Sequence, residues 1–256
     1  MERSESFADH YSQARQFFAS QTEIERKHIG DALVFELSKV KMPRIREAVL
    51  SHLPNIDKDL AKTVAGGLGM DVPKPAKPAE KPKDDLKPSD ALSIVKNGPD
   101  TFAERKLGLF VSEGAPASLV KGLRSAVKKA DAVCEMVTPK IGGVTLDNGD
   151  ELEGDEKIDG GPSVLYDAVA LMMSEEGVQH LAEDAPSRDF VTDAFAHCKF
   201  IAFNEPVRAM FEAVGLVGDL DEGCVELTTQ KSARAFVDGL GPLRYWDREM
   251  AVDADA

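Results

Sequence analysis

The chain has 256 residues, 43% of them hydrophobic, with 45 acidic side chains against 31 basic ones and a net charge of −14. This acidic balance works against binding to nucleic acid or to an anionic membrane, and no apolar run approaches the roughly 20 residues that span a bilayer. The start of the chain, residues 1–6, is charged and lacks the apolar segment of a secretory signal. Cys134, Cys198 and Cys224 lie far apart and form no C-x-x-C pair, so we expect a reducing compartment, the cytoplasm.

The first 70 residues are typical of several short helices. Thr22 and Glu25 form the pattern of a capping box, in which each side chain hydrogen-bonds the backbone amide of the other residue. Pro43 is placed to begin a second helix, and Asp57 to cap a third. Apolar residues follow each start at helical spacing, and a group of glycines provides a left-handed stop. The apolar stripes are Ile29, Leu33, Leu37 and Val40, then Ile45, Val49 and Leu53, then Leu60, Val64 and Leu68; the glycines are Gly66, Gly67 and Gly69.

An earlier short helix is expected to carry Phe7, Tyr11, Ala14, Phe17 and Phe18. Helices this short and one-sided bury little apolar surface by themselves, and this aromatic group is larger than so small a unit needs. We therefore expect part of this face to pack on something outside the chain.

Prolines and lysines alternate over residues 73–83. Proline removes a backbone donor and fixes φ, so this run continues neither a helix nor a central strand, while the lysines favour an extended, solvated path. We expect a semi-rigid linker over residues 71–90. It separates a helical segment, residues 1–70, from a second domain, residues 91–256.

The second domain shows the pattern of an α/β fold. Four short apolar runs read as buried parallel strands: Leu107–Val111, Val133–Val137, Ala168–Met173 and Phe200–Phe203. Helical stretches separate them, which predicts a right-handed, doubly wound parallel sheet. The helices are expected at Pro116–Ala130, at Glu176–His197 with a break at Pro186, at Glu205–Val214, and over residues 229–249 with an end near Trp246. Asn148-Gly149 predicts a type I′ turn in an inserted hairpin between Val144–Leu146 and Glu151–Leu152.

Ligands of such sheets lie beyond the carboxyl ends of the strands, where this sequence has three turns. Ser112–Pro116 has no G-x-G-x-x-G and no Walker lysine, so we interpret it as an ordinary strand-to-helix turn. Ser174–Gly177 places two carboxylates at a helix start, where they stabilise the helix dipole rather than serve acid–base catalysis. Phe203–Pro206 turns sharply from a strand into a helix.

Metal chemistry has no support in the sequence. His10, His28, His52, His180 and His197 form no H-E-x-x-H motif and no pairing with cysteine at zinc spacing. No metal site is predicted.

The helical segment resembles a known family. Phe7-Ala-Asp-His-Tyr-Ser-Gln-Ala-Arg-Gln-Phe-Phe18, Glu36-Leu-Ser-Lys-Val40 and the run from Arg46 to Asp57 closely resemble the helical segment of large-subunit haem catalases. The order that follows, a Pro-rich linker and a flavodoxin-like domain, fits the same family. The resemblance implies hydrogen peroxide disproportionation at a buried haem, in a homotetramer that also contains a β-barrel domain.

In that family the haem-site residues lie in the barrel, which precedes the helical segment. No position of this chain matches their motifs, so we assign no catalytic, cofactor-binding or metal residue here. The resemblance implies haem in the complete catalase and none in this chain.

The α/β domain is also similar to the class I glutamine amidotransferase-like superfamily, whose enzymes place a cysteine nucleophile at the turn after one strand. Alignment through Lys199–Ala202 puts Glu205 at this position. A carboxylate does not replace a thiolate in attack on an amide. Cys198 precedes the strand, and its neighbour His197 is no indication of a dyad, so Cys198 and Cys134 are interpreted as structural.

Three functions remain open at this point. The leading hypothesis is the C-terminal part of a large-subunit catalase, with a structural role and no activity alone. The alternative is a free-standing chaperone-like or small-ligand-binding α/β module. A cysteine hydrolase or amidotransferase is disfavoured by the missing cysteine.

Overall fold

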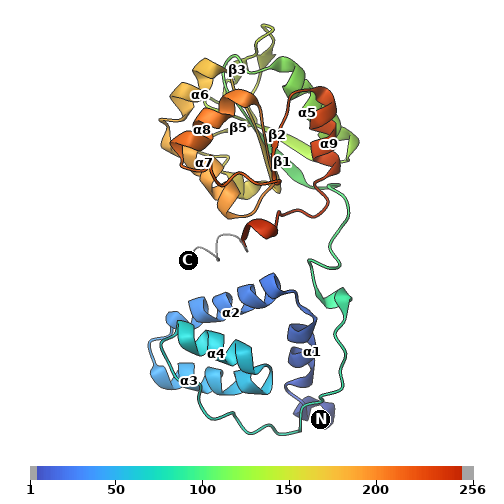
Figure 1. Cartoon of the computed structure of the whole chain (residues 1–256), viewed down its shortest axis with the longest axis vertical. Helices are drawn as coiled ribbons and strands as arrows, with labels where there is room; N and C mark the ends of the chain where they lie inside the picture. Colours follow the sequence, from blue (N-terminus) through green and yellow to red (C-terminus); the bar gives the residue numbers. More distant parts are fainter. Residues whose placement is uncertain (1–4, 250–256) are drawn as a thin grey trace. The chain divides into compact units, whose positions relative to one another are not determined.

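The computed structural model describes residues 5–249 and divides into two compact units, Met1–Gly98 and Pro99–Ala256 (Figure 1). The first unit is helical, and the second contains the sheet. Each unit has its own hydrophobic core and is described by itself.

Short helices pack around one small core in the first unit. The core is made by Phe18, Leu37, Leu50 and Val64 with their apolar neighbours. The helices are η1 (Glu5–Ala8), α1 (Ser12–Ser20), α2 (Glu23–Ser38), α3 (Pro43–His52), η2 (Leu53–Asn55), α4 (Lys58–Gly67) and η3 (Asp90–Leu92).

The predicted helix signals of this unit are confirmed. Thr22 and Glu25 form the complete capping box at the start of α2, and Pro43 lies in the first turn of α3. The Asp57 carboxylate accepts the amides of Asp59 and Leu60 and caps α4. Gly69, at φ +64°, ends α4 in a left-handed conformation that a residue with a Cβ adopts only with strain.

The predicted aromatic group is split between the core and the surface. Tyr11 and Phe18 are buried, whereas Phe7 and Phe17 are exposed, at 66% and 46%. The Tyr11 hydroxyl lies 2.7 Å from Nδ1 of His52, which anchors α1 against α3. Only part of the aromatic face is therefore needed for the core of the unit.

The sequence predicts an extended, solvated linker over residues 71–90. The stretch is extended and mostly exposed, but its backbone is also bonded to the helical unit. Residues 71–97, called the strap below, lie along α3 and then α1 (Figure 1). The prolines of the strap form neither helix nor strand, as predicted. Side chains of the helical unit nevertheless hydrogen-bond the strap backbone. The Asn55 side-chain amide donates to the Ala76 carbonyl, and the Ser12 hydroxyl accepts the Lys83 amide. The units therefore divide at Gly98.

The second unit is a doubly wound α/β domain, as predicted. Its parallel sheet has the order β5-β2-β1-β6-β7-β8, the flavodoxin-like order with one short strand added at the edge. In register, Leu109 of β1 lies between Met136 of β2 and Ala170 of β6. The strands are β1 (Lys106–Val111), β2 (Val133–Thr138), β5 (Glu156–Lys157), β6 (Ala168–Met172), β7 (Ile201–Phe203) and β8 (Cys224–Glu226), and a separate hairpin pairs β3 (Val144–Thr145) with β4 (Glu151–Leu152).

Helices cover both faces of the sheet (Figure 1). Alternate residues of β1 enter opposite cores, with Leu109 packing in one and Phe110 in the other. One core lies under α5 (Ala117–Lys129) and α9 (Gln230–Asp238), and the other under α6 (Glu175–Leu181), α7 (Ala185–Ala196) and α8 (Arg208–Ala213). Two 3-10 turns, η4 (Ser163–Leu165) and η5 (Glu205–Val207), complete the domain.

Two details of the prediction were wrong. The last helix does not run to Trp246: α9 ends at Asp238, before Gly239, and an irregular segment follows. The hairpin turn is not type I′, because Gly149 has a positive φ, +86°, and Asn148 does not. The amide of Gly149 bonds the Leu146 carbonyl, so the loop is a type I turn followed by one left-handed residue.

Candidate functional site

The carboxyl ends of β1 and β6 meet at the point where the chain connections diverge, the usual ligand position in a doubly wound sheet. The structure brings together two of the predicted turns here. The Ser174 amide donates to Oγ of Ser112 (2.9 Å), and the Ser174 hydroxyl donates to the Glu113 carbonyl (2.6 Å). These bonds use the groups that would otherwise face a ligand.

Close packing fills the rest of this crevice. Ser112 is 1% exposed, and a Cβ at Gly177 would lie 2.2 Å from its Oγ. The Gly177 amide, at the start of α6, already donates to Oγ of Ser174. Close packing therefore leaves little room for a phosphate between these turns.

The turn after β7 is fastened by a side-chain amide. Asn204 is 6% exposed; its Oδ1 accepts the Met173 amide (2.9 Å) and its Nδ2 donates to the Met173 carbonyl (2.7 Å). Glu205 is exposed, begins η5 and has no left-handed backbone strain of the kind found at a nucleophile elbow. The turn links β6 to β7 and presents a carboxylate, not a thiol.

All three cysteines are poor nucleophiles. Burial raises the pKa of the Cys134 thiol to about 12 and that of Cys224 to about 11. Burial also raises the pKa of Cys198, which is 4% exposed and precedes β7, at the end of the strand opposite Glu205. A thiol reacts as its thiolate, so these side chains are inert at neutral pH.

A groove of about 810 Å³ lies between α5 and the β3–β4 hairpin. Its lining mixes the cations Lys121 and Arg124 with acidic residues of the hairpin. Oδ1 of Asp147 accepts the Ala117 amide (2.9 Å) and so caps α5, which leaves that helix start unsuited to an anion. The groove therefore shows no preference for a ligand of either charge.

The residues of the described structure do not fit a haem. The five histidines are exposed, and no group of three or more potential ligands gathers anywhere in residues 5–249. Neither this groove nor a smaller one of about 220 Å³ beside α1 is lined by a histidine, cysteine or tyrosine, the usual axial ligands. No step of haem chemistry is derived from this chain.

Sequence reasoning missed two buried cations of the second unit. Lys199 is 2% exposed, and its Nζ donates to the carbonyls of Ser163 and Tyr166. Burial, aided by the charge of Arg244, lowers the pKa of Lys199 to about 8. Arg248 is 4% exposed and pins the segment after α9 to the domain. Neither had a signal in the sequence, because a lone cation at the edge of an apolar run does not show what it will contact.

These features define a flavodoxin-like α/β domain joined to a small helical unit, with a filled switch point and a turn without a thiol. The family described as the C-terminal domain found in long catalases matches residues 103–250, and the family described as catalase-related immune-responsive matches residues 4–68. The chain belongs to the C-terminal region of the long catalases.

Individual relatives agree over almost the whole chain. "Catalase C" of Rhizobium meliloti (strain 1021) is 51% identical over 98% of this chain, and "Catalase HPII" of Pseudomonas aeruginosa is 35% identical over 98%. "Catalase-B" of Dictyostelium discoideum is 33% identical, also over 98%. The chain spans only 36%, 35% and 36% of the lengths of these three relatives. Within residues 5–249, no helix combines the length and apolar character that a membrane crossing requires.

Proposed function

We propose that this chain is the structural and stabilising C-terminal part of a large-subunit catalase. The complete haem enzyme disproportionates hydrogen peroxide, and this part provides no haem site of its own. Its partners are the β-barrel domain of the same protein and the other subunits of a homotetramer. Residues 1–70 act as the catalase-type helical segment, 71–90 as its linker and 91–256 as the flavodoxin-like domain. The three free cysteines suit a reducing compartment, the cytoplasm.

The observation that carries this proposal is the uncovered apolar surface of the first unit. Of 14 large hydrophobic side chains exposed in the described structure, nine lie in the first 98 residues, although the second unit is larger. Exposed apolar side chains are thus more frequent in the first unit than in the second, and exposed apolar patches commonly mark contact surfaces between proteins. The nine are Phe7, Phe17, Phe35, Met42, Ile45, Val72, Leu92, Ile94 and Val95.

The two units also differ in net charge. Residues 1–98 carry 16 basic and 15 acidic side chains, whereas residues 99–256 carry 15 basic and 30 acidic ones. The first unit thus has almost no net charge and meets little long-range repulsion from another acidic protein surface, whereas the second unit is strongly acidic. The first unit is therefore the part that we expect to pack on the barrel.

A free-standing chaperone-like or small-ligand module is the second candidate, because the same exposed surface can recruit a client. The filled switch point gives a small-ligand role no support in the second unit. The two candidates differ in what covers the apolar face of the first unit: the rest of a catalase, or a changing set of clients.

A chimera tests the proposal. The matching C-terminal segment of the Rhizobium meliloti relative is replaced by this chain, and assembly and thermal inactivation are compared for the parent, the chimera and a truncated parent. We expect the chimera to resemble the parent and the truncated form to lose assembly or heat resistance. A Phe17→Asp chimera should fall toward the truncated form, while an Arg234→Gln chimera, altered on the exposed face of α9, should not. Equal heat resistance of the parent and the truncated form would contradict the stabilising role.

A further inference from the structure

The strap is held along most of its length by side chains of the first unit. The hydroxyls of Ser12 and Ser20 accept the amides of Lys83 (2.7 Å) and Ser89 (2.9 Å). Nε2 of Gln21 donates to the Leu92 carbonyl (3.0 Å). The bonds reach residues about 70 positions away in the sequence, so they fix the path of the strap rather than a local turn.

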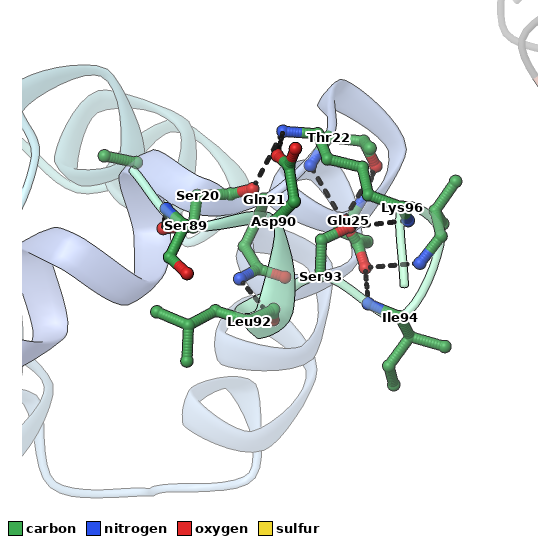
Figure 2. Close-up of polar contacts among 12 residues, drawn as sticks. Ser20, Gln21, Thr22, Glu25, Ser89, Asp90, Leu92, Ser93, Ile94 and Lys96 are labelled. Carbon is green, nitrogen blue, oxygen red and sulfur yellow. Dashed lines mark hydrogen bonds and ion pairs between the residues drawn. The ribbon is translucent and has the colours of Figure 1, made fainter. Parts of the chain in front are cut away.

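The carboxylate of Glu25 accepts more hydrogen bonds from the strap than any of these other side chains. Its Oε2 accepts the Ser93 hydroxyl (2.8 Å), and its Oε1 accepts the amides of Ile94 (2.8 Å) and Val95 (3.2 Å). The same Oε2 accepts the amide and hydroxyl of Thr22 in the capping box of α2. Figure 2 shows the strap residues converging on this one carboxylate. Bonds to an ionised acceptor are among the stronger hydrogen bonds in proteins.

Lys96 closes the attachment. Its Nζ donates to the Ser20 carbonyl (3.1 Å) and lies 3.3 Å from Asp90, and its amide donates to Oγ of Ser93 (3.0 Å). The Asn97 amide also donates to the Ser93 carbonyl (3.1 Å). The first residue buried in the core of the second unit is Phe102, which is 3% exposed. Only residues 98–101 therefore lie between the last bond of the strap and this core.

Docking of the strap changes the length of chain that joins the units. With the strap attached, the path from Lys96 to Phe102 extends at most about 20 Å. With the strap released from residue 71 onward, about 30 residues become free, and a Pro-rich chain of that length reaches about 95 Å. The same segment is thus a short tether when docked and a long one when released.

We propose that the strap is a two-state tether, whose docking on α1 and α2 restricts the reach of the second unit, and that Glu25 is the positioning residue that keeps it docked. The lysines from Lys74 to Lys87 are exposed and do not oppose docking, whereas Pro73, Ala76, Pro78, Pro82, Leu86 and Ser89 are half-buried. The proposal does not depend on the function of the complete protein.

Hydrogen exchange on the whole 256-residue chain tests the proposal. In the wild-type chain the amides of Ile94, Val95 and Lys96 should be protected although they lie in no helix or strand. Glu25→Gln removes the charge that accepts two of these amides and should speed their exchange about tenfold or more. Glu23→Gln, in the same turn of α2 but without a bond to the strap, is the matched control and should leave them unchanged. Exchange at unstructured-peptide rates in the wild type, or equal effects of both variants, would overturn the proposal.

Further measurements separate strap release from helix damage. Ser93→Ala leaves the capping box intact and should also speed exchange at Lys96. In Glu25→Gln, amides inside α2 such as that of Leu37 should keep their protection while trypsin cleaves faster after Lys83 and Lys96, the two strap lysines that no proline follows. The largest dimension in small-angle X-ray scattering should increase in Glu25→Gln and not in Glu23→Gln. An unchanged dimension with a released strap would contradict the tether role.

Discussion

Arg248 and Asp221 form a two-pronged ion pair, with Nε–Oδ2 at 2.6 Å and Nη2–Oδ1 at 2.8 Å. The guanidinium also donates to the carbonyls of Phe195 and Lys199, and it lies over the Phe195 ring at 4.2 Å from the centroid. One buried cation therefore connects the segment after α9 with α7, the connection before β7 and the loop before β8. The contact holds the segment after α9 against the rest of the second unit.

Removing the carboxylate should destabilise the second unit. Asp221→Ala leaves Arg248 buried without its counter-ion, which costs about 3 kcal/mol and lowers the melting temperature of this unit by roughly 6–12 °C. Calorimetry or near-ultraviolet circular dichroism measures the change. Asp219→Ala, on the same loop but exposed, is the control and should melt within about 2 °C of the wild type. Equal melting of both variants would show that the pair contributes nothing.

Acid should weaken the first unit through Glu25. Partial burial acts to raise its pKa, but the bonds from Thr22, Ser93 and Val95 outweigh it and lower the pKa from 4.5 to about 2. The folded state thus holds the proton less tightly than the unfolded state. The contribution is complete above pH 4.5 and disappears as the pH falls toward about 2; after allowance for solvent screening it amounts to about 1–2 kcal/mol.

Urea denaturation of the first unit at pH 7 and pH 3 checks this expectation. The stability difference between wild type and Glu25→Gln should shrink at the lower pH, and that between wild type and Glu23→Gln should change much less. A difference that stays constant between the two pH values would contradict the role of the Glu25 charge.

Lys199 should produce a dependence of the same sign at alkaline pH. Burial lowers its pKa from 10.5 to about 8, so between these values the unfolded chain holds a proton that the folded chain has lost. Stability therefore gains about 2–3 kcal/mol as the pH rises through this window. In Lys199→Met the gain should be missing. The cysteines titrate equally in both proteins, so the difference between their denaturation midpoints at pH 7.5 and pH 10 isolates Lys199; parallel profiles would refute the assignment.

The thiols should react slowly in the folded chain. Because burial raises the pKa of Cys134 and Cys224 to about 12 and 11, alkylation by iodoacetamide at pH 7.5 should be about 100-fold slower than in urea. Mass spectrometry of the labelled peptides identifies each site. Rapid labelling of Cys198 in the folded chain would revive the cysteine-hydrolase hypothesis.

The fold could be predicted where the chemistry is local or the burial is complete. The strands β1, β2, β6 and β7 are continuous apolar runs, and the caps at Thr22 and Asp57 are short-range patterns. The edge strands β5 and β8 were missed because they are short and only half-buried or exposed, so their sequences lack an apolar run.

The path of the strap and the second role of Glu25 could not be predicted. The prolines exclude helix and strand. However, the hydrogen-bond partners of the strap backbone lie about 70 residues away in the sequence, and the local sequence does not indicate which residues they are. The capping-box pattern identified Glu25, and its contact with Ser93 arises only when the strap folds back. At the turn after β7 the sequence predicted a carboxylate in place of a thiol, and the structure places the exposed Glu205 at the start of η5.

The proposed role gives this chain no haem site of its own. The direct measurement is to incubate the purified chain with haemin and to record both the Soret band and the oxygen released from hydrogen peroxide. The account predicts no stoichiometric Soret band and no oxygen release above that of haemin alone. A one-to-one haem spectrum together with catalytic loss of peroxide would contradict it.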